Sequence, residues 1–217
     1  WLIRARLRIR GRVSVTDFVP WSRFATIENL DIDPPFVPYQ ARSFQRKLGE
    51  RLVAAEREGR PLRLWILKSR RMGSSTAWQV RFVHRATTRR HFTALTVAQD
   101  HDAASYLFGM AEGIYERLPS GLRVPKLRGN QGRLIQLSNG STLRTASAQT
   151  TEAGRSKGQR AVHASEVAFW PNPQRTMTAL KQIVAPRPGT LFALESTANG
   201  AGNYFHQQYL RAKAGEG

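Results

Sequence analysis

Residues 62–76 read Leu-Arg-Leu-Trp-Ile-Leu-Lys-Ser-Arg-Arg-Met-Gly-Ser-Ser-Thr, an apolar run followed by a loop that contains one glycine. The apolar run predicts a buried strand, and the helical pattern beyond it predicts that the loop leads into a helix. Against the phosphate-loop pattern G-x-x-x-x-G-K-[ST], Gly73 takes the second glycine and Ser75 takes the hydroxyl that binds magnesium. Lys68 stands at the first glycine and Ser74 at the lysine, so the pattern is only partly met.

Two interpretations of this loop are open on these residues alone. An ordinary strand-to-helix turn would need Gly73 only for its bend. A nucleotide site would use backbone N–H groups at the helix N-terminus to attract phosphate, and Lys68 would supply the ammonium group from the start of the loop. In open α/β sheets ligands bind at the carboxyl ends of the strands, which is where this loop lies.

Strand-like and helix-like segments alternate through the rest of the chain. Apolar runs predict further strands at residues 92–98, 133–137, 142–146, 161–165 and 190–196. Helical periodicity predicts helices at residues 41–58, 75–90, 100–118, 173–184 and 204–214. Asn139-Gly140 predicts a hairpin turn. Strands separated by helices imply right-handed crossovers, and therefore an α/β fold with a mostly parallel sheet flanked by helices.

The chain carries a large excess of positive charge. Of its 217 residues, 41% are hydrophobic, and 34 Lys and Arg against 15 Asp and Glu leave a net charge of +19. This excess predicts a polyanionic partner, and the predominance of Arg favours bidentate contacts to phosphate, although a GC-rich genome would raise the Arg count in the same way. Residues 59–99 contain no acidic residue and predict a basic face of the folded domain.

Other features of the composition exclude several classes of site. The chain has no cysteine, which excludes disulfides and thiolate metal sites. Its histidines follow no metal-ligand spacing. No apolar run is long enough to span a membrane, so we expect no membrane partner.

The first 35 residues predict a basic arm and linker that precede the main domain at residues 36–217. Residues 3–13 alternate Arg with apolar residues so strictly that a strand would place five arginines on one face. A solvated edge strand and a DNA-contacting arm both fit this pattern. Residues 31–38 contain three prolines, which excludes a continuous helix and predicts the linker.

Two further strand ends carry polar residues that suit nucleotide chemistry. The apolar run at residues 161–166 closes on Glu166, a position that suits a carboxylate orienting the attacking water beside a γ-phosphate. An Asp normally precedes such a Glu and helps to hold magnesium, whereas Ser165 offers only a neutral hydroxyl. Residues 196–200, Ser-Thr-Ala-Asn-Gly, suit the sensing of phosphate loss. Alone, each signal is weak, because any buried strand can end at a Glu or in a loop closed by glycine.

In order and spacing, these three motifs resemble the ATPase domain of tailed-phage terminase large subunits, the motors that package DNA. The resemblance covers about residues 36–210. Residues 68–76 are similar to the family's deviant phosphate loop, in which the basic residue has moved to the start of the loop. Residues 166–172, Glu-Val-Ala-Phe-Trp-Pro-Asn, are similar to its acidic motif, and residues 196–200 to its coupling motif. The resemblance implies a three-layer P-loop NTPase fold of the ASCE, RecA-like type.

The resemblance also implies which residues bind nucleotide and magnesium. Lys68 and the loop amides would hold the β- and γ-phosphates of ATP, and Tyr39 with Gln40 would contact the adenine, although packing and capping roles for this pair are an open alternative. Magnesium would be held at Ser75 and Ser165. The implied nucleotide-binding set is Tyr39, Gln40, Lys68, Ser69, Arg71, Gly73, Ser74, Ser75 and Thr76.

Catalytic and coupling residues follow from the same resemblance. Glu166 would polarise the attacking water. Arg70 would act in cis on the γ-phosphate, and Arg155 would act as an arginine finger on the neighbouring subunit, with a DNA-binding or surface role for Arg155 as the open alternative. The implied coupling residues are Ser196, Thr197, Asn199 and Gly200.

The activity implied is ATP hydrolysis that drives double-stranded DNA into a procapsid, without sequence preference. The implied partners are the portal protein, the small terminase subunit and further copies of the chain, pentameric on the portal, in the host cytoplasm and transiently on the procapsid. The family's C-terminal nuclease domain is not expected in these residues. Two other functions are open: a superfamily 2 helicase-like ATPase, which needs a second RecA-like domain, and a non-catalytic basic DNA-binding scaffold, which would hydrolyse no ATP.

Overall fold

A single six-stranded sheet forms the centre of the computed structural model, which describes residues 18–29, 31–127, 132–150 and 158–215. Its strands are β3 (Leu62–Leu67), β4 (Thr93–Ala98), β5 (Leu134–Gln136), β6 (Thr142–Ser147), β7 (Ala161–Ala164) and β8 (Leu191–Ser196). They lie in the order β3-β8-β7-β4-β6-β5. All neighbours are parallel except β5 and β6, which form the hairpin predicted at Asn139-Gly140.

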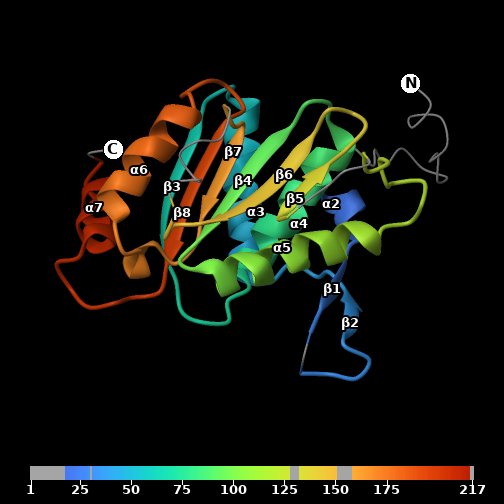
Figure 1. The fold of residues 1–217 in the computed structure, drawn as a ribbon, viewed down its shortest axis with the longest axis horizontal. Helices are drawn as coiled ribbons and strands as arrows, with labels where there is room; N and C mark the ends of the chain where they lie inside the picture. Colours follow the sequence, from blue (N-terminus) through green and yellow to red (C-terminus); the bar gives the residue numbers. More distant parts are fainter. Residues whose placement is uncertain (1–17, 30, 128–131, 151–157, 216–217) are drawn as a thin grey trace.

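Helices cover both faces of this sheet, which gives three layers (Figure 1). One face carries α3 (Ser43–Arg57), α4 (Ser74–Thr88) and α5 (His101–Glu116), and the other carries α6 (Pro173–Ile183) and α7 (Tyr204–Lys213), with the short 3₁₀ helix η2 (Val167–Phe169). Successive strand residues point to opposite layers, as a strand buried on both faces requires. The predicted α/β fold is therefore confirmed. Among the described residues, no helix is long and apolar enough to cross a membrane.

Within the described residues, the chain begins with α2 (Phe18–Ser22), β1 (Thr26–Glu28) and β2 (Phe36–Pro38), which precede α3. β1 and β2 pair antiparallel, so residues 36–38 form a strand where a linker was expected. Pro38 has no N–H to donate, but it can end β2 because the hydrogen bond at this end of the pair comes from the next residue. The Tyr39 N–H donates to the Ala25 carbonyl at 2.8 Å. Trp21 is fully buried in the same core as α3 and α4. The predicted arm at residues 3–13 lies outside the described residues.

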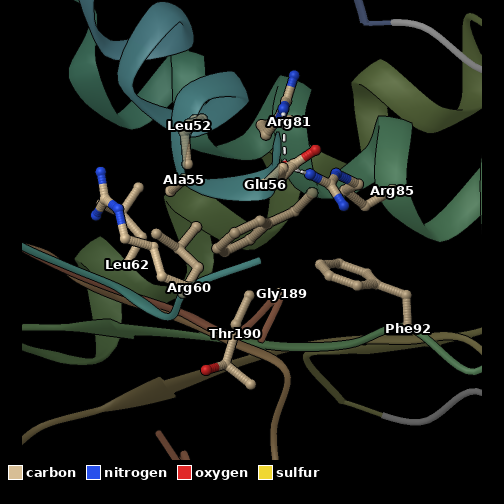
Figure 2. A pocket seen from close by; sticks show the side chains of 13 residues that line it. Leu52, Ala55, Glu56, Arg60, Leu62, Arg81, Arg85, Phe92, Gly189 and Thr190 are labelled. Atoms are coloured by element: carbon tan, nitrogen blue, oxygen red, sulfur yellow. Dashed lines mark hydrogen bonds and ion pairs between the residues drawn. The ribbon is translucent and has the colours of Figure 1, made fainter. Parts of the chain in front are cut away.

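An ion-pair cluster with two buried arginines joins the C-terminal halves of α3 and α4 (Figure 2). The Arg81 and Arg85 side chains are only 6% and 9% exposed, and both reach the Glu56 carboxylate, Arg81 with a distance of 3.2 Å from Nη2 to Oε1. Arg89, one turn further on, is half exposed, with Nη2 3.6 Å from Glu56 Oε2. The expectation of a basic face is wrong for Arg81 and Arg85, because α4 is buried along most of its length.

Candidate functional site

The strand order brings the three sequence motifs to one edge of the sheet. β8 lies between β3 and β7, and all three run parallel, so their carboxyl ends adjoin. The loop after β3 starts at Lys68, the turn after β7 contains Glu166, and Thr197 follows β8 directly. Residues up to 129 positions apart in the chain therefore meet here, counting from Lys68 to Thr197.

Lys68 and Glu166 form an ion pair at this edge. The distance from Lys68 Nζ to Glu166 Oε1 is 2.5 Å, and the lysine side chain is only 8% exposed. The Thr197 N–H and hydroxyl both donate to the other carboxylate oxygen at 2.9 Å. Burial opposes ionisation of Glu166, but the hydrogen bonds from Lys68 and Thr197 outweigh it and hold the pKa of Glu166 below its ordinary value. The carboxylate is therefore charged at neutral pH.

The turn that contains Glu166 is held in place by residues of the predicted coupling motif. Glu166 has φ 53° and ψ 47°, a left-handed conformation that costs a non-glycine residue about 1–3 kcal/mol. The Ala168 N–H donates to the Ser196 hydroxyl at 3.2 Å, and the Asn199 amide donates to the Ala168 carbonyl at 3.0 Å. The polar residues at the end of β8 and directly after it thus contact both the Glu166 side chain and the backbone that positions it.

Helix α3 holds the loop that precedes α4. The Gln45 amide donates to the Gly73 carbonyl at 2.7 Å, and Arg42 Nη1 donates to the Arg71 carbonyl at 3.1 Å. Gly73 has φ 73°, and a Cβ added there would lie 2.6 Å from Gln45 Nε2. The glycine is therefore required both for its backbone conformation and for the close approach of Gln45.

Replacing Gly73 with Ala should lower the free energy of unfolding by about 1–3 kcal/mol, because the variant must hold a left-handed conformation and displace Gln45. Gly49→Ala in α3 is the matched control, since nothing lies within 4 Å of its added Cβ. That control should gain up to about 1 kcal/mol from helix propensity. Urea unfolding of both variants checks this, and equal stabilities would contradict the account of the loop.

A cleft of about 650 Å³ lies between this loop and the β1–β2 hairpin. Such a volume is typical of small-molecule sites. Five of the residues predicted to bind nucleotide line it together: Tyr39, Gln40, Arg71, Gly73 and Thr76. The Tyr39 side chain also packs into the core, and this burial raises the pKa of its hydroxyl to about 12, against the opposing charge of Arg81. The hydroxyl therefore stays neutral.

Other predicted residues have different placements. Ser69 and Arg70 are exposed in the loop, so their roles remain predictions. Ser165 is buried, and its carbonyl accepts a hydrogen bond from Trp170 Nε1 at 2.9 Å. Gly200 has φ 72° in the loop after β8. Arg155 lies outside the described residues.

Sequence reasoning missed two fully buried side chains at this edge, Glu195 and His163. Glu195 Oε2 accepts a hydrogen bond from the Ser74 hydroxyl, and Glu195 Oε1 accepts one from Ser75 at 3.2 Å. His163 Nε2 lies 3.0 Å from the same Oε1. The sequence signal that could have found Glu195 is its position directly after the apolar run Leu-Phe-Ala-Leu in β8, because a carboxylate buried there needs a hydrogen-bonding or charged partner.

The fold is similar to those of solved phage terminases. The structure of the HK97 bacteriophage large terminase matches 90% of this chain with a TM-score of 0.65 and 14% sequence identity. The chain spans 40% of that protein's length. A second match is a mutant ATPase domain of the Thermus phage P74-26 large terminase, with a TM-score of 0.52 and 20% identity. This match covers 80% of the present chain and 70% of the phage domain. No protein-family model and no curated protein matches the sequence. The chain thus has the fold of a phage large-terminase ATPase domain.

Proposed function

We propose that this chain binds magnesium-ATP at the carboxyl edge of its sheet and hydrolyses it to drive DNA packaging into a phage procapsid. The observation that carries the proposal is the meeting of Lys68 and Glu166 at 2.5 Å beside the loop that opens α4. This pair brings together a cation that can bind phosphate and a carboxylate that can activate water, at the ends of β3 and β7, which are separated only by β8. The fold shared with large terminases supports the same conclusion.

The first step is phosphate binding at the start of α4. Backbone N–H groups at a helix N-terminus attract anions, and Lys68 adds a full positive charge at the other end of the loop. An incoming triphosphate would compete with Glu166 for the Lys68 ammonium group. Binding of ATP therefore frees the Glu166 carboxylate, so that the hydrolytic group becomes available only when substrate is present.

The residues at this edge also fit a magnesium ion. Magnesium prefers oxygen ligands, and the Ser75 hydroxyl lies in the first turn of α4. When bound, the ion would neutralise negative charge that develops on the phosphate oxygens during hydrolysis. Ser75 would hold it directly, with Ser165 further along the same edge.

Hydrolysis would follow at Glu166. Its Oε2 is fixed by the Thr197 N–H, and Oε1 points toward Lys68, where the terminal phosphate would enter. The charged carboxylate can accept the proton of the attacking water. Release of phosphate would then alter the contacts of Thr197 and Asn199. The side-chain amide of Asn203, at the start of α7, donates to the Asn199 carbonyl at 2.7 Å. This hydrogen bond offers a route by which a movement of Asn199 would reach α7.

The partners follow from the fold and from charge. A chain with a net charge of +19 is suited to the phosphates of double-stranded DNA. By analogy with large terminases, we infer that the chain acts with a portal protein and a small terminase subunit as a pentamer in the host cytoplasm, transiently on the procapsid. Arg70 in cis and Arg155 in trans are the proposed arginines for the transition state.

Replacing Lys68 with Ala should weaken binding of a fluorescent ATP analogue in magnesium buffer by about 10–100-fold, because a hydrogen bond to a charged group contributes about 1.5–3 kcal/mol. Lys47→Ala is the matched control, since Lys47 is exposed on α3. Fluorescence titration measures both. Equal affinity of the Lys68 variant and the parent would contradict the assigned role of Lys68, and a parent that binds no ATP would overturn the proposed function.

A further inference from the structure

We propose that Glu195 supplies the carboxylate of the magnesium site that Ser165 cannot supply, by orienting the Ser75 hydroxyl toward the ion. The inference rests on the proposed function and deepens it, because it assigns a positioning residue that none of the three sequence motifs contains. It also explains how the site can work although an uncharged residue precedes Glu166.

Strand register places Glu195 level with Ser165. In the parallel pair β7–β8, Ala164 lies opposite Leu194, so the next residues, Ser165 and Glu195, continue at the same height. In the pair β3–β8, Glu195 lies opposite Ile66, two residues before Lys68. Neighbouring strands are about 4.8 Å apart. The carboxylate is thus displaced by one strand from the expected position, toward the loop that binds phosphate.

The contacts of Glu195 point to the first turn of α4. One carboxylate oxygen accepts from Ser74 and the other lies 3.2 Å from the Ser75 hydroxyl. A serine that donates its proton to a carboxylate keeps its lone pairs free for a cation, and outer carboxylates of this kind orient metal ligands in many proteins. Ser74, which takes the place of the usual lysine, serves as a second donor to the same carboxylate.

The Glu195 side chain is completely buried, and its contacts are divided between His163 and the first turn of α4. A structural ion pair with His163 alone would not require contacts to two hydroxyls of α4. The arrangement therefore places a buried carboxylate directly against the serine that would hold magnesium.

The test is the magnesium dependence of nucleotide binding, measured with a fluorescent ADP derivative over a MgCl₂ series and in EDTA. Glu195→Gln should raise the magnesium concentration for half-maximal binding by about 10–100-fold, as loss of an outer carboxylate does at other metal sites. Binding in EDTA should be unchanged. Glu112→Gln, in a surface pair with Lys126, is the control and should behave like the parent.

Two further variants separate a metal role from a structural one. Glu195→Asp keeps a carboxylate at this position but shortens the side chain and withdraws it from Ser75, so the magnesium midpoint should still rise. Adding Ser165→Asp to Glu195→Gln restores a carboxylate at the same height and should return the midpoint toward that of the parent. Parental midpoints in both Glu195 variants, with magnesium-dependent binding in the parent, would overturn the inference and leave the proposed function standing. A parent that binds no ADP derivative would overturn both.

Discussion

The Glu166→Gln variant will hydrolyse ATP at least about 100-fold more slowly than the parent chain, because a general base contributes about 10²–10⁴-fold to rate. Glutamine matches the size of glutamate and keeps an oxygen for the Thr197 N–H bond, but it cannot accept a proton from water. ATP affinity should be equal or higher, since Lys68 is no longer held by a carboxylate and is free for phosphate.

Phosphate release should be measured in magnesium with double-stranded DNA, at protein concentrations high enough for subunits to associate. Association matters because the proposed Arg155 would act on a neighbouring subunit. Glu50→Gln, exposed on α3, is the matched control and should retain the parental rate. A Glu166→Gln variant with parental turnover would remove Glu166 from the mechanism, and absence of turnover in the parent would favour the non-catalytic scaffold.

Replacing Glu56 with Ala should lower the free energy of unfolding by up to about 3–5 kcal/mol, the usual result of removing one partner from a buried ion pair, because two buried arginines lose a carboxylate that is itself 30% exposed. Arg81 and Arg85 both pair with this carboxylate (Figure 2), and their side chains are almost fully buried. Without it, two guanidinium groups remain in the domain core with Arg89 nearby as a further positive charge. Their desolvation then has no carboxylate to offset it, and Arg81 keeps the weaker contact with the Phe18 ring, 4.4 Å from its centroid.

Glu58→Ala is the matched control for Glu56, because it removes a carboxylate only two residues away. Glu58 pairs with Arg60 on the surface, and both side chains are at least half exposed. Exposed pairs contribute about 0–1 kcal/mol, so this control should change stability little. Urea unfolding of the two variants provides the comparison, and a Glu56 variant as stable as the Glu58 variant would show that the arginine cluster does not depend on Glu56.

Most of the α/β core could be predicted from sequence because its signals are local. Residues 62–67 were predicted as a strand with the bounds that β3 has, because apolar residues dominate the run. The prediction that this strand is buried was wrong, since β3 lies at the edge of the sheet, where only Leu62 is buried and Leu67 is 48% exposed. Helix α5 begins where predicted because Asp100 caps it, accepting the Ala103 N–H at 2.7 Å. By contrast, the three-residue strands β1 and β2 exist through their pairing, which no local pattern encodes.

The candidate site was predictable to the same degree. Lys68, Gly73 and Glu166 carry local motif signals, and the structure places Lys68 against Glu166. Glu195 and Gln45 carry none that sequence can interpret alone. The meaning of Glu195 depends on β8 lying between β3 and β7, and that of Gln45 on α3 packing against the loop. Strand order and helix docking are tertiary facts, so these residues could be assigned only after the fold was known.

A crystal structure of the chain with magnesium and a non-hydrolysable ATP analogue tests the central claim most directly. The account predicts the triphosphate over the loop between Lys68 and Gly73, with Lys68 Nζ moved from Glu166 to a phosphate oxygen and the Glu166 carboxylate facing the terminal phosphate. A nucleotide bound elsewhere, or bound there with the Lys68–Glu166 pair intact and Glu166 remote from the phosphates, would contradict it.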